Sequence, residues 1–177
     1  MQTRNEKIQL LTRLNEGKKL IPSFLAELSE AIGGQIDSTA LATLPDTDSL
    51  LETFRAGYQR SKTADGMVYQ RYFRSHQKAK LFEISDCIGK RLSAETTFLI
   101  TKNSHFCGAV RTDILATLGH AASIIRLDGD SVCLVSEDRQ QGLLIDQNLD
   151  DPEQTYELTV WGNRWSSAVS YCESSGG

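Results

Sequence analysis

The sequence predicts an α+β fold in which N-terminal helices pack on a C-terminal, mainly antiparallel β-sheet arranged as a meander. Apolar residues recur three or four positions apart as far as residue 92, which is typical of helices. From Thr96 onwards, short β-branched apolar runs alternate with polar turns. The regular strand–helix alternation of a doubly wound fold is missing. We therefore expect one domain over 1–172, helical over about 3–92 and strand-rich over about 96–172, followed by a flexible tail at 173–177.

Four helices are expected in the first half. A weak one lies around residues 8–14, and a second begins behind Pro22, because proline suits a first helical turn. Gly33 then supplies a C-terminal stop. A third helix starts near Ser49, which opens a Ser-x-x-Glu capping box, and a fourth covers about 77–92. Each apolar stripe covers one side only, so we expect these helices to pack on one face of the sheet.

The second half contains six candidate strands and one short helix within VRTDILATLGHA. The strands are TTFLIT (96–101), ASIIRL (122–127), SVCLVS (131–136), GLLIDQ (142–147), TYELTVW (155–161) and WSSAVSYC (165–172). The turn Asp128-Gly129-Asp130 predicts a hairpin between the second and third of them. The preceding segment MVYQRYF is too short to assign, and the pairing order of the strands is open.

The last predicted hairpin turns at Gly162-Asn163-Arg164 and places Trp161 opposite Trp165. This register puts both rings on the polar face with Glu157, whereas a slip of one residue would bury them. Tryptophan and arginine are enriched among interface hot spots. Trp161, Trp165 and Arg164 are therefore candidate partner-binding residues.

The composition indicates a cytoplasmic protein. The N-terminus mixes charges into every short apolar run, unlike a signal peptide, and no run approaches the roughly 20 apolar residues that span a bilayer. We therefore expect no membrane association. Cys87, Cys107, Cys133 and Cys172 lack the short spacing of a metal or redox motif, and in this compartment we expect four free thiols.

Charge is segregated along the chain. Residues 55–91 carry nine Lys or Arg and three acids, whereas 92–177 carry five Lys or Arg and twelve acids. An acidic surface can complement a basic partner and speed their encounter, although acids in loops also simply keep a sheet edge soluble. On the first interpretation, four acids of the predicted loops are partner-binding candidates: Glu137, Asp138, Asp150 and Asp151.

The best catalytic candidates are Cys107, His105 and His120, which supply the residue types of a thiol nucleophile and its base. Nothing in the sequence lowers the pKa of the thiol, and a small buried Cys107 is the simpler interpretation. The three histidines are too scattered for a metal site, and neither a P-loop nor a dinucleotide motif is present. We therefore expect no metal and no cofactor.

The basic segment 55–91 supports an alternative function. Its aromatic residues Tyr69, Tyr72 and Phe73 are interleaved with Arg71 and neighbouring cations, the ingredients of base stacking and phosphate contact. The same charges could instead lie on a solvated face or meet acidic parts of the chain. Nucleic-acid binding is therefore a rival hypothesis.

The run DGDSVCLVSEDRQQGLLID, followed by YELTVWGNRW, resembles small bacterial α+β immunity proteins, which bind and block a cognate toxin. The resemblance covers about 40 residues at the C-terminal end, and no functional residue is carried over from it. The leading hypothesis is a non-enzymatic intracellular protein-binding domain, such as an inhibitor or immunity protein, that engages its partner through the acidic strand-rich half. The rivals are a small thiol enzyme and a nucleic-acid binder; the oligomeric state is open.

Overall fold

The computed structural model describes residues 3–62, 68–151, 153 and 155–174. Helices and strands follow in the order α1 (Arg4–Ile32), η1 (Ser38–Ala40), α2 (Leu44–Ser61), β1 (Val68–Phe73), η2 (Ser75–Gln77), α3 (Lys78–Arg91), β2 (Thr96–Ile100), α4 (Ser104–Cys107), β3 (Val110–Asp113), α5 (Ile114–Gly119), α6 (Ala121–Asp128), β4 (Ser131–Ser136), β5 (Gly142–Gln147), β6 (Tyr156–Trp161) and α7 (Asn163–Ser174). The predicted α+β class is confirmed.

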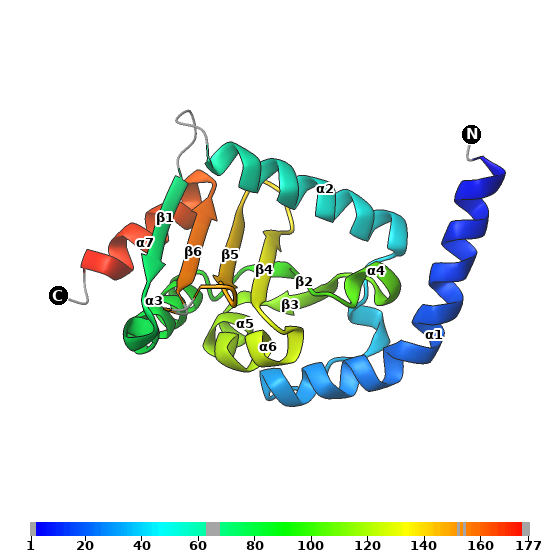
Figure 1. Cartoon of the computed structure of the whole chain (residues 1–177), viewed down its shortest axis with the longest axis horizontal. Helices are drawn as coiled ribbons and strands as arrows, with labels where there is room; N and C mark the ends of the chain where they lie inside the picture. Colours follow the sequence, from blue (N-terminus) through cyan, green and yellow to red (C-terminus); the bar gives the residue numbers. More distant parts are fainter. Residues whose placement is uncertain (1–2, 63–67, 152, 154, 175–177) are drawn as a thin grey trace.

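The strands form one antiparallel sheet in the order β1-β6-β5-β4-β2-β3 (Figure 1). The predicted meander of β4, β5 and β6 is confirmed. The unassigned segment MVYQRYF contributes β1, which pairs with β6 at one edge of the sheet. Strands far apart in sequence are thereby placed side by side.

Helices lie on both faces of the sheet, so the expectation that they pack on one face is wrong. The larger core joins one sheet face to the second half of α1 and to α3, α5, α6 and α7. A smaller core on the other face contains Leu50 of α2 with Ile100, Ala109 and Val135. The apolar stripe of α2 thus finds a second sheet face, because strand residues alternate between two sides and both carry apolar positions here.

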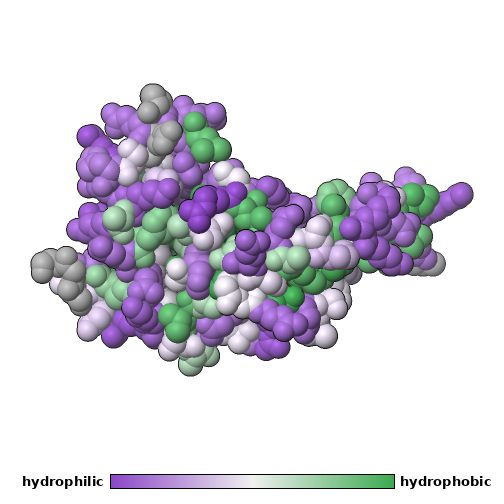
Figure 2. All heavy atoms as spheres, turned by 90° about the horizontal axis from the view of Figure 1, so that it is seen from below, coloured by the Kyte–Doolittle hydropathy of each residue, from purple (hydrophilic) through white to green (hydrophobic). Residues whose placement is uncertain are grey.

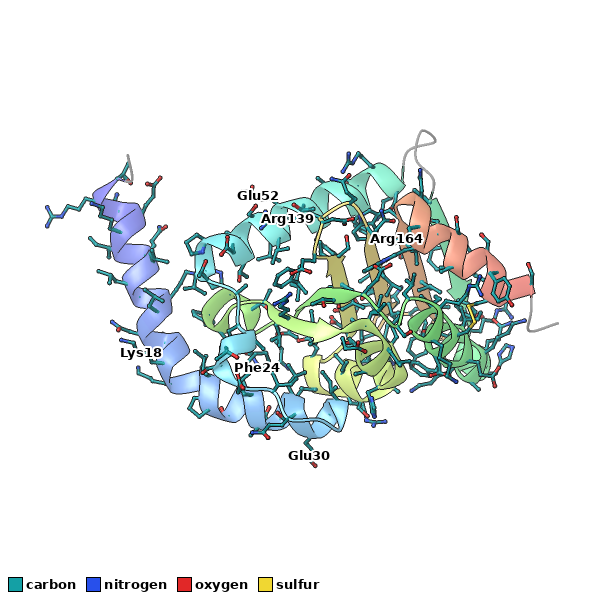
Figure 3. All side chains as sticks on the ribbon, turned by 180° about the vertical axis from the view of Figure 1, so that it is seen from behind. Lys18, Phe24, Glu30, Glu52, Arg139 and Arg164 are labelled. Carbon is teal, nitrogen blue, oxygen red and sulfur yellow. A yellow bond between two sulfur atoms is a disulfide. The ribbon has the colours of Figure 1, made fainter. Side chains whose placement is uncertain are left out.

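The N-terminal helices differ from prediction in their boundaries. One helix, α1, replaces the two expected before Gly33, and Pro22 lies inside it. Proline has no N–H to donate to the carbonyl four residues back, here Lys18, and α1 bends in this region (Figures 1 and 3). The next helix, α2, begins at Leu44 behind Thr43, whose hydroxyl accepts from Asp46 N–H; the capping box expected at Ser49 is therefore wrong.

Two predicted strands are helices. ASIIRL belongs to α6 and WSSAVSYC to α7, so neither the hairpin at Asp128 nor the one at Gly162 exists. The buried apolar side chains of α7 lie three and four positions apart, which is the period of a helix and not of a strand. They are Trp165, Ala168, Val169 and Cys172. Gly162 has φ +90° and ends β6 before α7 begins.

Trp161 joins α2 to the sheet. Its ring packs edge-on against Phe54, with the ring centroids 5.1 Å apart. A Cβ atom added to Gly57 of α2 would lie 2.1 Å from its indole nitrogen, and one added to Gly142 of β5 would lie 2.0 Å from its Cζ2. Only glycine fits at these two positions, so both let α2 and β5 close around one indole.

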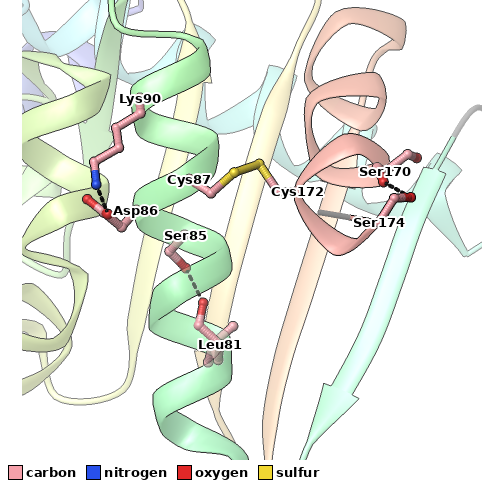
Figure 4. The surroundings of a disulfide bond; sticks show 8 residues. All are labelled: Leu81, Ser85, Asp86, Cys87, Lys90, Ser170, Cys172 and Ser174. Atoms are coloured by element: carbon pink, nitrogen blue, oxygen red, sulfur yellow. Dashed lines mark hydrogen bonds and ion pairs between the residues drawn. A yellow bond between two sulfur atoms is a disulfide. The ribbon is translucent and has the colours of Figure 1, made fainter. Parts of the chain in front are cut away.

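A disulfide joins Cys87 of α3 to Cys172 of α7, with Cα atoms 5.9 Å apart (Figure 4). The expectation of four free thiols is therefore wrong; Cys107 and Cys133 are the free cysteines. The helical form of α7 turns Cys172 towards α3, a contact that the predicted hairpin did not contain. Of the predicted tail 173–177, Glu173 and Ser174 are helical, and 175–177 lie outside the described residues.

We predict that Gly57→Ala lowers the free energy of unfolding by about 1–3 kcal/mol, because the added methyl group overlaps the Trp161 indole. Helix propensity alone would favour alanine by about 1 kcal/mol, so the sign of the change is diagnostic. Gly34→Ala is the control, since nothing lies within 4 Å of the position of its Cβ. Urea unfolding measures both; a stabilised Gly57→Ala variant would refute this packing.

We also predict that the Cys87–Cys172 bond, which spans 85 positions, stabilises the fold by about 4 kcal/mol by restricting the unfolded chain. Urea unfolding with and without reductant measures the difference. The double variant Cys87→Ala/Cys172→Ala should unfold at the same urea concentration as the reduced protein, and reductant should not change that concentration. Four reactive thiols in the unreduced, denatured chain would show that the bond is absent.

Candidate protein-binding surface

A row of four side chains crosses the sheet on the α2 side. Tyr72 of β1 pairs with Glu157 of β6, Glu157 with Asp146 of β5, and Asp146 with Ser131 of β4. Paired residues of neighbouring strands point to the same face. We call these four residues the cross-strand row.

The cross-strand row lies beyond the part of the sheet that α2 covers. Trp161 and Thr159, further along β6 on the same face, are buried, whereas Tyr72 is 62% exposed. Asp146, Glu157 and Ser131 are partly exposed. Figure 1 shows α2 crossing one end of the strands, near the end of β6. The half of this sheet face that carries the row is thus open to solvent.

Glu157 is held in place by three neutral donors. Its Oε1 accepts from the Gln70 amide at 2.8 Å, from the Thr159 hydroxyl at 2.5 Å and from the Tyr58 hydroxyl at 3.4 Å. These donors carry no charge, so they fix the position of the carboxylate; the nearest cation is Lys62, whose pKa is raised first by Tyr58 and also by the charge of Glu157. Glu157 therefore presents a fixed negative charge at the centre of the row.

Asp146 lies directly opposite that charge. Burial raises the pKa of Asp146, and the charges of Asp130 and Glu157 raise it further. Like charges directly opposite in a sheet are destabilising. The same field acts on Cys133, two positions along β4 from Ser131: burial, helped by nearby carboxylates, raises the pKa of its thiol to about 12.

The negative surface continues beyond the sheet. The β5–β6 loop begins after Gln147 and presents Asp150 together with Leu149, whose side chain is 60% exposed. Asp151 has its pKa lowered by the Thr155 hydroxyl and the Glu153 N–H, so it stays ionised. The sequence has no Lys, Arg or His from residue 140 to 163. An exposed leucine thus sits beside carboxylates at one end of the sheet, where Arg74, directly after β1, pairs with Glu153 at 3.5 Å.

The other predicted acids are paired within the chain. Glu137 forms an ion pair with Arg111 at 2.7 Å. Asp138 lies 3.6 Å from Arg164, and its pKa is lowered first by the Ser136 hydroxyl. These two acids therefore belong to a different region from Asp150 and Asp151, and their charge is already partly matched.

Both tryptophans are buried, on opposite faces of the sheet. Trp161 is 7% exposed beneath α2, and Trp165 is fully buried in the larger core. The Trp165 indole N–H donates to Glu95 at 2.8 Å, and Arg164 forms an ion pair with the same carboxylate at 2.9 Å. The expectation of two exposed rings is wrong, because α7 is helical and carries Trp165 into the core while Arg164 and Glu95 secure its first turn.

The candidate catalytic residues are not assembled. Cys107 is buried, and burial raises the pKa of its thiol, whereas a nucleophile needs a lowered one. Within the described chain, no hydrogen bond joins Cys107 to either histidine. The His105 ring stacks edge-on against Phe106, and His120 Nδ1 lies 2.9 Å from the Ala116 carbonyl.

The basic segment 55–91 is distributed over α2, β1 and α3, where several cations already have partners. Arg71 pairs with Glu173, Lys90 with Asp86, and Lys78 lies over the ring of Phe82. In the part of the chain that the structure describes, no helix is long and apolar enough to cross a bilayer. Nor do the described residues include three or more His, Cys, Asp or Glu grouped to hold a metal ion.

No protein-family model matches this chain, and neither the curated proteins nor the solved structures include one significantly similar to it.

Tyr72 and Glu157 were considered separately in the sequence, and Asp146 was not singled out. Tyr72 belongs to the basic segment, whereas both acids belong to the acidic half of the chain. The row exists because β1 pairs with β6, and no local pattern encodes that pairing.

We predict that Asp146→Asn stabilises the fold at neutral pH. The folded-state pKa of Asp146 is raised, so the destabilisation by its carboxylate develops as pH rises above the ordinary aspartate value and is fully present above the folded-state pKa. Near pH 3, below the ordinary aspartate value of about 3.9, the carboxyl is mostly protonated in both states and the advantage should shrink.

Asp150→Asn, at an exposed loop position, is the matched control and should change the free energy of unfolding by less than about 0.5 kcal/mol. Chemical unfolding at both pH values measures the difference. A destabilised Asp146→Asn variant at pH 7 would show that Asp146 makes favourable contacts as a carboxylate.

Proposed function

We propose that this chain acts by binding a protein, and that the open sheet half with its cross-strand row is the binding surface. The observation that carries the proposal is Asp146, a partly buried carboxylate held opposite Glu157. Such an arrangement lowers stability, and proteins commonly retain it where function requires it.

The partner's chemistry follows from the surface. Two exposed side chains lie beside carboxylates: Leu149 precedes Asp150, and Tyr72 lies opposite Glu157 with the Lys62 ammonium nearby. A complementary partner would present Lys or Arg around an apolar centre, so that the cations neutralise the repulsion between Asp146 and Glu157 on contact. An inhibitor or immunity-type role, in which the chain covers a basic surface of its partner, is the biological form that we favour.

The proposed surface lies in the acidic strand-rich half, as the sequence predicted, but most of its residues are different. Asp150 remains part of the surface, and Asp151 orders the loop through Thr155. Trp161 and Trp165 are instead buried, and Arg164 lies outside the surface. Glu137 and Asp138 fall outside it as well.

We predict that a photo-crosslinking phenylalanine analogue in place of Tyr72 gives a discrete protein adduct in cells, and that one in place of Tyr171 does not. Tyr171 is the matched control because it is also exposed, on α7. Both variants must have the wild-type circular dichroism spectrum.

The captured protein, once purified, should bind Asp150→Lys at least about 10-fold more weakly than wild type, with most of the change in the association rate. Glu83→Lys makes the same charge change at an exposed site on α3 and should bind like wild type. Equal losses for the two variants, or equal adducts from positions 72 and 171, would contradict the proposal.

A further inference from the structure

The N-terminal part of α1, residues Arg4–Leu20, has little contact with the rest of the described chain; we call it the arm. Of its residues only Gly17 is buried. Ile8, Leu11 and Leu14 are 52%, 60% and 42% exposed. Figure 2 shows the arm projecting from the body, with apolar side chains among hydrophilic ones. With Leu20, which is 37% exposed, the arm carries four exposed aliphatic side chains, and such a group on one projecting helix is characteristic of a contact surface.

The arm is nevertheless held at a defined position. Arg13 donates to both carboxylate oxygens of Asp48 in α2, each at 2.8 Å, and its Nε donates to the His105 carbonyl at 2.8 Å. A Cβ atom on Gly17 would lie 2.2 Å from the Phe106 carbonyl oxygen, so the arm touches α4 there. A bidentate arginine fixes direction as well as distance. The arm is therefore a presented surface with a set orientation.

The outward face of the arm is positive at both ends and apolar in the middle. Five residues with alternating spacings of three and four make up this seam, which is the period of a coiled-coil contact: Arg4, Lys7, Leu11, Leu14 and Lys18. Among the described residues, no ion pair engages the three cations of the seam. Lys19, beside it, pairs with Glu16.

A groove of about 820 Å³ lies between the arm and the body. Glu6, Leu10 and Arg13 line the arm side, and Pro45 and Asp48 of α2 and Phe106 of α4 line the body side. From Leu44 to Phe54, α2 carries three acids and no cation: Asp46, Asp48 and Glu52. One chain thus offers a positive apolar seam and, next to it, a groove lined by the carboxylates of Glu6 and of Asp48, the latter paired with Arg13, with Glu52 one helical turn beyond Asp48 on α2.

From this charge complementarity we propose that two copies of the chain exchange arms, each seam lying in the groove of the other copy. Because seam and groove adjoin in every chain, a two-fold axis can satisfy both contacts at once and closes the assembly as a dimer. Direct pairing of two seams is disfavoured, since it would bring Arg4 of one copy near Lys18 of the other. This inference is independent of the open sheet half.

Sedimentation velocity over a range of concentrations tests the dimer. Wild-type protein should shift from monomer to dimer, and Leu11→Asp should raise the dissociation constant by more than about 10-fold, because it places a carboxylate in an apolar contact. Leu149→Asp is the matched control: the two leucines are equally exposed, at 60%, so both variants should fold. Leu149→Asp should dimerise like wild type.

Charge reversal then identifies the contact. Lys7→Glu/Lys18→Glu and Glu6→Lys/Glu52→Lys should each weaken the dimer, and an equimolar mixture of the two variants should restore association. Wild-type protein that stays monomeric at every concentration would overturn the proposal. This would hold even if its positively charged arm bound anionic phosphatidylglycerol vesicles instead. A mixture that fails to associate would overturn the seam-in-groove contact. Either failure leaves the crosslinking at position 72 as a separate test of the open sheet half.

Discussion

The position of α2 against the sheet depends on one indole. Trp161 fills the space between Gly57 of α2 and Gly142 of β5, and neither glycine could carry a side chain there. Because Trp161 lies at the end of β6, α2 is drawn over that end of the face and leaves the other end open. The same placement sets Asp48 where Arg13 can reach it. The open sheet half and the orientation of the arm both follow from this contact.

The two faces of the sheet then serve different purposes. On the larger core side, apolar residues of the strands meet those of α1, α3, α4, α5, α6 and α7, and the Cys87–Cys172 bond fixes α7 to α3. On the α2 side, the smaller core stops short of Glu157 and Asp146. Stability gained on the first side offsets the repulsion retained on the second. A protein can keep such a repulsion only when the rest of its fold is secure.

Patterns of neighbouring residues predicted the elements that depend on local spacing. The i, i+3, i+7 series of Leu81, Ile84 and Ile88 marks α3, and the polar turns between β4, β5 and β6 mark the meander. Short apolar runs were ambiguous: the pair Ile124-Ile125 reads as strand in isolation, and only its spacing from Ala121 favours the helix. Local patterns could not predict contacts between distant parts of the sequence: the pairing of β1 with β6, the packing of α2 on the second sheet face and the disulfide. The cross-strand row depends on the pairing of β1 with β6. The sequence therefore contains its residues but does not show that they lie side by side.

The central claim is that α2 buries Trp161 and leaves the cross-strand row open. Hydroxyl-radical footprinting read out by mass spectrometry compares these side chains in one experiment on the native protein. The account predicts rapid oxidation of Tyr72, which is 62% exposed, and protection of Trp161, which is 7% exposed, although an indole is intrinsically as reactive as a phenol. Rapid oxidation of Trp161 together with protection of Tyr72 would contradict it.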